Sequence, residues 1–139
     1  MFLDRQLCIR KFTPRIAETF RVIPQDIGRV LLNLFNNAFY AVQQRQNGAE
    51  PDYKPTVELT TFVPRQGFLG IKVKDNGAGI PEAIKDKIMQ PFFTTKPTGQ
   101  GTGLGLSLSY DIVTKAHGGQ LTITSAERQD TQFEIILPF

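Results

Sequence analysis

The chain has 139 residues, the length of one domain with a substantial core. Its apolar share of 40% and charged share of 21% are ordinary for a globular protein. The net charge of +3 is mild, and because basic and acidic residues are interspersed, no nucleic-acid partner is expected. The single cysteine, Cys8, excludes an intrachain disulfide and fits a reducing, cytoplasmic setting. No segment approaches the roughly 20 apolar residues of a membrane span, so we expect no membrane contact by this domain, and the anchor of a membrane-bound parent protein would lie outside it.

The predicted elements begin with a weak segment and then a strong helix. Residues 1–15 show no clear period, and residues 16–23 alternate loosely, as a strand does. Pro24 then opens a helix whose apolar side chains follow the i, i+3, i+4, i+7 spacing of one buried face. Those side chains are Ile27, Val30, Leu31, Leu34, Phe35, Ala38 and Val42. Residues 43–55 are polar, with interspersed glycine and proline, and predict a loop.

Downstream of that loop the sequence predicts two strand pairs and two further helices. The strands are predicted at residues 56–63, 68–74, 121–125 and 131–137. A short helix is expected from Pro81 to about Met89, since proline suits a first helical turn. A longer helix is expected from about Leu104 to a C-cap at His117-Gly118-Gly119. Between these two helices, residues 91–103 predict a long loop.

The order of these elements decides the fold class. Consecutive strand pairs favour a two-layer α/β sandwich over a doubly wound parallel sheet. We therefore expect an α+β fold, with a mixed sheet of about five strands packed on three helices, over one domain of residues 1–139.

The first candidate site lies on the long helix. Asn33, Asn36 and Asn37 fall away from the centre of the apolar stripe, and Asn33 and Asn37 share a face because they are four residues apart. Asparagine is a poor helix former, so three asparagines within five residues lower the stability of the helix, and their presence calls for an explanation. One interpretation is a solvated polar face. The other is amide oxygens offered to a hard cation such as Mg²⁺, which completes its shell with phosphates and water.

The second candidate site is the glycine turn after the second predicted strand. Asp75 stands at the end of that strand, where its carboxylate can accept a hydrogen bond from an exocyclic amine. Gly77 and Gly79 let a flat base lie against the backbone. The alternative is an ordinary Asp-Asn-Gly turn with no ligand.

The third candidate site is a glycine-rich loop that runs into the second long helix. Glycines at positions 99, 101, 103 and 105 let backbone amides approach a phosphate chain, and a helix N-terminus adds unpaired N–H groups. Glycine-rich loops are also common as linkers. Neither the Walker pattern nor G-x-G-x-x-G after a strand is present, so a P-loop or Rossmann site is not supported.

Taken in order, these patterns resemble the Bergerat-fold ATPases and kinases, and within them the catalytic ATP-binding domain of sensor histidine kinases. The matching segments are residues 31–38 for the N box, 75–80 for the first glycine box, 91–96 for the F box and 101–106 for the second glycine box. The resemblance covers residues 24–138, nearly the whole chain. It implies a Bergerat sandwich with ATP and Mg²⁺ as cofactors.

The resemblance also implies a role for each matching residue at the phosphate end. Asn37 would bind Mg²⁺, and Asn33 would contact the metal or a phosphate. Lys96 would offer a cation to the terminal phosphate. The lid over the phosphates would consist of Gly101, Thr102, Gly103, Leu104, Gly105 and Leu106.

At the base end, the resemblance implies that Asp75 holds the adenine amino group and that Thr131 assists this contact. Gly77 and Gly79 would shape the base pocket beside Ile80. Phosphoryl transfer needs positioning and charge neutralisation more than covalent protein chemistry, and such a site supplies both.

The phosphate acceptor is expected on another domain. The chain has one histidine, His117, and its place at a Gly-Gly helix end indicates a capping role. Histidine kinases carry the acceptor on a dimerising helical hairpin, for which the residues before Pro24 are too few; residues 1–23 would be the remnant of the connection to it. The implied partners are a dimerisation or histidine phosphotransfer domain of the same or a partner kinase and, indirectly, a response regulator.

Two alternatives remain open from the sequence. One is a stand-alone anti-sigma-factor-type serine kinase, which would be expected to carry an acidic residue near Asn33. The other is a nucleotide-binding regulatory module with no transfer activity. Because the amide of Asn33 cannot act as a general base toward water, we expect weak ATP hydrolysis.

Overall fold

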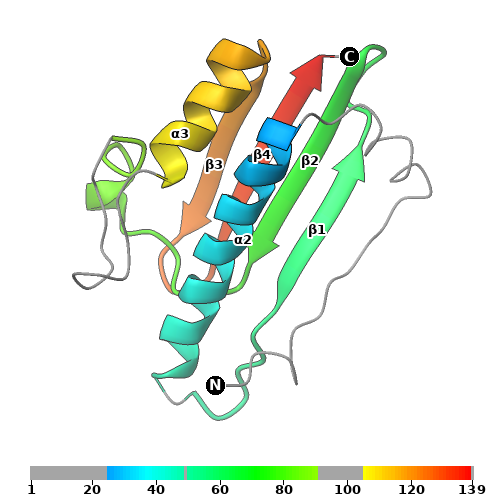
Figure 1. Ribbon diagram of the computed structural model, residues 1–139. Coiled ribbons are helices and arrows are strands. Elements are labelled where there is room, and N and C mark those ends of the chain that lie inside the picture. Colours follow the sequence, from blue (N-terminus) through cyan, green and yellow to red (C-terminus); the bar gives the residue numbers. More distant parts are fainter. Residues whose placement is uncertain (1–24, 49, 91–104, 139) are drawn as a thin grey trace.

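The residues that the structure describes form a four-stranded sheet with a helical layer on one face (Figure 1). This computed structural model describes residues 25–48, 50–90 and 105–138. The helices are α2, Gln25–Gln46, and α3, Gly105–Asp111, which continues as a π-helical turn at Ile112–Ala116. The strands are β1, Val57–Phe62; β2, Phe68–Asp75; β3, Gln120–Ala126; and β4, Asp130–Pro138.

The sheet has the order β1-β2-β4-β3, and every pairing is antiparallel. Short turns join β1 to β2 and β3 to β4, so these neighbours in sequence pair directly. Between β2 and β3 the chain passes through the helical layer, and β4 then returns into the space between them. This topology places the end of β2 next to the start of β4, although the two are far apart in the sequence.

The predicted two-layer α+β sandwich is confirmed, and two details differ. Within the described residues the sheet has four antiparallel strands rather than a mixed set of about five. The strand expected at 16–23 lies outside the described residues. The helix expected from Pro81 to Met89 is a single 3₁₀ turn, Glu82–Ile84, followed by further turns. Its backbone bonds run from residue i+3 to residue i, as from Lys87 to Ile84, so no α-helical ladder forms there.

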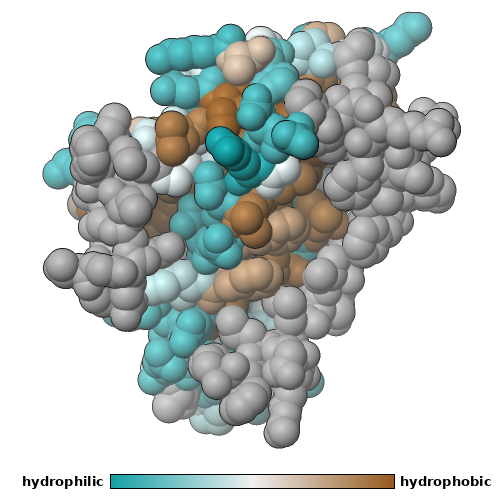
Figure 2. All heavy atoms as spheres, viewed as in Figure 1, coloured by the Kyte–Doolittle hydropathy of each residue, from teal (hydrophilic) through white to brown (hydrophobic). Residues whose placement is uncertain are grey.

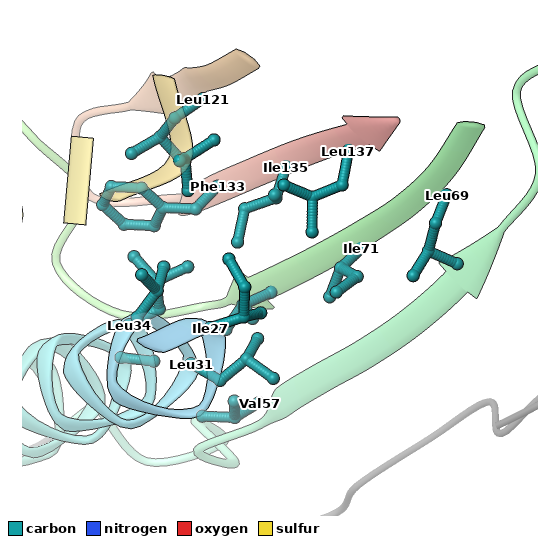
Figure 3. Close-up of a cluster of buried hydrophobic side chains, with 14 of the residues drawn as sticks. Ile27, Leu31, Leu34, Val57, Leu69, Ile71, Leu121, Phe133, Ile135 and Leu137 are labelled. Atoms are coloured by element: carbon teal, nitrogen blue, oxygen red, sulfur yellow. The ribbon is translucent and has the colours of Figure 1, made fainter. Parts of the chain in front are cut away.

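The core lies between α2 and the inner face of the sheet. Figure 3 shows Ile27, Leu31 and Leu34 of α2 directed toward strand side chains that include Ile71 and Ile135. The predicted apolar stripe of α2 is confirmed: all its members are buried except Phe35, which is half-buried and stacks on Phe39 with ring centroids 6.1 Å apart. Burial of this stripe is the main stabilising contribution of the helix, because isolated helices are marginal in water.

The outer surface of the helical layer carries both polar and apolar side chains (Figure 2). Leu32 of α2 and Leu108 of α3 are among the exposed large hydrophobic residues there. Neither α2 nor any other helix in the described ranges is apolar and long enough to span a membrane.

Candidate functional site

One row of paired residues crosses the sheet at the end where β2 finishes and β4 begins. In register, Val57 pairs with Asp75, Asp75 with Thr131, and Thr131 with Ser125. Directly opposed residues of antiparallel strands point to the same face, with Cβ atoms about 4.5–5.5 Å apart. Asp75, Thr131 and Ser125 are all buried, at 3%, 3% and 8% exposure, so three polar side chains share the inner face.

Asp75 is the charged member of this row. The Gly77 amide donates to its Oδ1 over 2.8 Å, which fixes the carboxyl group at the start of the glycine turn. Burial raises the pKa of Asp75 from 3.8 to about 7; the Gly77 hydrogen bond opposes this shift and the charge of Asp130 adds to it. The carboxylate is therefore held at a site that does not favour its charge, which is typical of functional groups.

Ser125 connects the row to the glycine turn. The Ile80 amide donates to Ser125 Oγ over 2.9 Å, although the two residues are 45 positions apart in the sequence. Ser125 Oγ also lies 2.8 Å from the Asp130 carbonyl and 2.9 Å from Thr131 Oγ1. Ser125 is not among the site residues predicted from the sequence. Its signal was available, because in β3 a serine follows Leu121 and Ile123 at an inward position of a regularly alternating strand.

The two glycines of the turn lie where a side chain would clash with neighbouring elements, which the sequence did not reveal. A Cβ on Gly77 would lie 2.5–2.7 Å from atoms of Ala41 in α2, and the neighbouring Ala78 amide donates to the Ala41 carbonyl over 3.2 Å. Gly79 has φ +72°, and a Cβ there would overlap the carbonyl of Ala126, the last residue of β3. Both glycines therefore allow the turn to lie directly against α2 and β3.

Asn33 connects α2 to the start of α3. Its Nδ2 donates to the Gly105 carbonyl over 3.3 Å and to Ser109 Oγ over 3.2 Å. Since both amide hydrogens are used in this way, Oδ1 is the remaining polar atom of the side chain. Asn37 lies one helical turn further on and is half-buried, and its side chain makes no hydrogen bond within the described part of the chain.

These two amides define which metal chemistry is compatible with the site. The described residues contain no group of three or more His, Cys, Asp or Glu side chains that could hold a metal ion. A cation bound beside α2 would take amide oxygen from the protein and complete its shell with phosphate and water, which is the usual behaviour of Mg²⁺. The residues present fit that ion, whereas a soft metal such as Zn²⁺ would find no thiolate or imidazole ligand set among them.

Of the predicted lid, only the last two residues are described. Gly105 and Leu106 form the first turn of α3, beside Asn33. Five other predicted residues lie outside the described ranges: Lys96, Gly101, Thr102, Gly103 and Leu104. The predicted C-cap is confirmed, because the helix ends at Ala116 and Gly118 then adopts φ +63°.

Arg45, near the C-terminus of α2, joins two loops that flank the polar row. Its Nη1 donates to the carbonyls of Asn76, over 3.0 Å, and of Gln129, over 3.2 Å. The guanidinium group also lies 4.7 Å from the centroid of the Tyr53 ring and pairs with Glu50 over 2.9 Å. Asn76 immediately follows Asp75, and Gln129 lies two residues before Thr131, so this clamp holds the chain on both sides of the Asp75–Thr131 pair.

Comparisons with known proteins agree with this geometry. Residues 23–139 match the sequence model of the family described as histidine kinase-, DNA gyrase B- and HSP90-like ATPases. The chain belongs to this family. Together with the sensor kinases and the histidine kinase structure described next, this match confirms the predicted resemblance to the catalytic ATP-binding domain of sensor histidine kinases.

Named relatives within this ATPase family are sensor kinases. The chain is 44% identical over 114 residues to the two-component sensor PprA of Pseudomonas aeruginosa, covering 81% of this chain and 12% of PprA. It is 36% identical over 110 residues to the histidine-protein kinase AtoS of Escherichia coli, covering 79% of this chain and 16% of AtoS. The nucleotide-free catalytic domain of the histidine kinase ThkA superimposes with a TM-score of 0.65 at 33% identity, covering 82% of this chain and 66% of that one. The chain thus spans a small part of the length of these curated relatives and corresponds to their histidine kinase ATPase domain.

Proposed function

We propose that this chain binds Mg-ATP and transfers the γ-phosphate to a histidine on a separate dimerisation or phosphotransfer domain, in two-component signalling. The observation that carries the proposal is the buried Asp75 carboxylate, held at a strand end by the Gly77 amide in a chain of this ATPase family. An acceptor at that position suits the exocyclic amine of adenine. The proposal covers the chain as one catalytic domain, residues 1–139, acting on a partner in the cytoplasm.

The base would lie at the polar row and the phosphates beside α2. Asp75 accepts from the adenine amine with Thr131 alongside, and the turn from Gly77 through Gly79 to Ile80 forms the wall of the base site. Asn37 and Asn33 present amide oxygens from one face of α2 to the bound cation or a phosphate. Mg²⁺, when bound, neutralises charge on the phosphates during transfer. Gly101 to Leu106 and Lys96 would cover and neutralise the phosphate chain.

The same geometry favours transfer over hydrolysis. Asn33 stands one turn before Asn37, and its amide cannot take a proton from an attacking water. Its hydrogens are used in holding Gly105 and Ser109, which gives it a structural role at the start of α3. We therefore expect slow hydrolysis of ATP by the isolated chain and phosphorylation only when an acceptor domain is supplied.

Replacement of Asn37 by alanine tests the nucleotide site. Asn37→Ala should lower the affinity for Mg-ATP at least about tenfold, the effect of losing roughly 1.4 kcal/mol of interaction. Asn36→Ala is the matched control, because Asn36 is the adjacent residue of the same type and is exposed. Isothermal titration calorimetry with and without Mg²⁺ measures both variants. Equal affinity of the Asn37→Ala and Asn36→Ala variants would overturn the metal assignment.

The transfer step is tested by mixing the chain with a histidine-bearing hairpin domain and γ-labelled ATP. Acid-labile label on the hairpin supports the proposal. Acid-stable label on a serine substrate would instead indicate the serine-kinase alternative, and binding of ATP without any transfer would indicate a regulatory module.

A further inference from the structure

The hydroxyl of Ser125 has three polar neighbours and can satisfy them in only one way. A serine hydroxyl has one hydrogen and two acceptor lone pairs. The Ile80 amide is a donor, so it takes one lone pair of Oγ. The Asp130 carbonyl is an acceptor 2.8 Å away, so it must receive the single hydrogen. The second lone pair is left for Thr131, 2.9 Å away.

This count sets the direction of the hydrogen bond between the two hydroxyls. Because the hydrogen of Ser125 is used by Asp130, Thr131 must be the donor to Ser125. The reverse arrangement would leave Ser125 Oγ and the Asp130 carbonyl facing each other at 2.8 Å with no hydrogen between them. Thr131 therefore has no hydrogen left for a ligand and presents only lone pairs to it.

The neighbour of Thr131 across the β2–β4 pairing is also an acceptor. Asp75 pairs directly with Thr131, and both are 3% exposed on the same face. One oxygen of its carboxylate accepts from Gly77, and the other can accept from a ligand. The two adjacent side chains thus offer acceptors and, with Asp75 ionised, no donor. A purine with an amine at position 6 matches such a pair, whereas a carbonyl at position 6 places an acceptor atom against the lone pairs of the two side chains.

We propose that Ser125 is a positioning residue that determines the base specificity of the site. Because Ser125 accepts the hydrogen of the Thr131 hydroxyl, the Thr131–Asp75 pair selects a 6-amino purine over a 6-oxo purine. This inference rests on the proposed nucleotide-binding function and extends it to a residue that touches no ligand. The selectivity should be sizeable, because a carbonyl placed against desolvated acceptors cannot regain the hydrogen bonds that it had in water.

The test compares ADP with inosine diphosphate, whose base has a carbonyl in place of the 6-amine and a hydrogen on N1, at pH 8, above the pKa of about 7 of Asp75. The wild-type chain should bind ADP at least about tenfold more tightly. In Ser125→Ala the Thr131 hydroxyl is released and can donate to the 6-oxo group, so the ratio of the two affinities should fall about tenfold. Ser125→Ala also removes the hydrogen-bond acceptor of the Ile80 amide and loosens the glycine turn. Because this loosening affects the binding of both nucleotides equally, the ratio of the two affinities is the quantity to compare. Ser125→Thr keeps the hydroxyl and should retain the ratio.

Two further variants separate this role from simple loosening of the fold. Ser109→Ala removes another fully buried serine hydroxyl, at the contact between α2 and α3, and should leave the ratio unchanged. Thr131→Val should lower the affinity for ADP more than that for inosine diphosphate. Adding Ser125→Ala to it should change the ratio no further, because Ser125 acts through the Thr131 hydroxyl.

The outcomes distinguish the inference from the function on which it rests. A wild-type chain that binds neither nucleotide overturns the proposed function, and the inference with it. A wild-type chain that prefers ADP, with the same preference in Ser125→Ala, overturns the inference alone. If Ser125→Ala does not fold, the Ser125→Thr and Thr131→Val variants decide: a lost preference in the first or an unchanged preference in the second contradicts the proposal.

Discussion

The inner face of the sheet has an apolar region and a polar end, and the same three strands build both. Going along β2, β4 and β3, the paired inward residues are apolar through three rows and polar in the fourth. The apolar rows are Leu69 with Leu137; Ile71 with Ile135 and Leu121; and Val73 with Phe133 and Ile123. The polar row is Asp75, Thr131 and Ser125. The change occurs over one inward step, about 7 Å along a strand.

One strand register therefore serves two purposes. In the apolar rows, burial stabilises the fold, as the side chains facing α2 in Figure 3 illustrate. In the polar row, burial is unfavourable to the charge of Asp75, whose raised pKa is the measure of that cost. A register slip of one residue would turn both sets to the outer face, so the packing of the apolar rows also fixes the position of the polar row.

The largest effect is expected from an apolar row. Ile135→Ala removes a fully buried side chain and should lower the free energy of unfolding by about 2–5 kcal/mol, a large share of typical domain stability. Urea unfolding measures the loss. The affinity of the folded protein for ADP should be unchanged, because Ile135 lies two inward positions from Thr131.

Ile136→Ala is the matched control for Ile135→Ala. Ile136 is the adjacent residue of the same type, half-buried on the outer face of the sheet. Its loss should be less than about 1.5 kcal/mol, since less apolar area leaves water there. Equal losses for the two variants would mean that the inner face is not the principal core.

The polar row should respond in the opposite direction. Asp75→Asn removes a carboxyl group whose pKa is raised in the folded protein from 3.8 to about 7. Because the folded state holds that proton more tightly than the unfolded state, the contribution of Asp75 to stability is lost as pH rises from about 4 to about 7 and is constant above that. Relative to wild type, Asp75→Asn should therefore gain stability over this window, on the order of a few kcal/mol, while its affinity for ADP falls sharply.

Parallel urea titrations of wild type and Asp75→Asn at pH 4.5 and pH 8 give the measurement. Other titrating groups contribute equally to both proteins, so the difference between them isolates Asp75. A stability difference that is the same at the two pH values would contradict the buried, charge-disfavouring environment assigned to this carboxyl group.

The sequence predicted the apolar region more completely than the polar end, for a physical reason. The α2 stripe and the strand alternation are local patterns, and they located nearly all of the core. Asp75 and Thr131 were found through motifs. The alternation of β3 indicated that Ser125 points inward but not what it contacts. The roles of Ser125 and Arg45 were missed because they come from contacts with residues 45 and 84 positions away, which only the assembled sheet brings together. The prediction of a short helix from Pro81 to about Met89 was wrong, since a proline at the start does not distinguish a single 3₁₀ turn from an α-helix.

The smallest effect is expected at the edge of the polar end, where Arg45 holds the loops at Asn76 and Gln129. The Tyr53 hydroxyl supports this clamp by donating to Asn76 Oδ1 over 3.2 Å; burial raises its pKa to about 12, against the opposing charge of Arg45, so it keeps its proton. Because the Arg45 side chain is 24% exposed, water and salt weaken its ion pair with Glu50. Arg45→Gln should therefore lower the free energy of unfolding by only about 1 kcal/mol.

The effect of Arg45→Gln should instead be local. In the two loops that Arg45 joins, the Ala78 amide donates to the Ala41 carbonyl of α2 and the Arg128 amide donates to the Ala78 carbonyl. Both amides should exchange with deuterium faster in the variant. Arg65→Gln is the matched control: its guanidinium lies 4.0 Å from the Phe68 ring centroid at the opposite end of β2, so both amides should keep their wild-type rates. Equally faster amide exchange in the two variants would mean that the loss of any arginine stacked on an aromatic ring loosens the sheet. Arg45 would then not be a specific clamp of the polar end. Faster exchange in Arg45→Gln alone would show that the row holding Asp75 and Thr131 is positioned from α2 as well as by strand register.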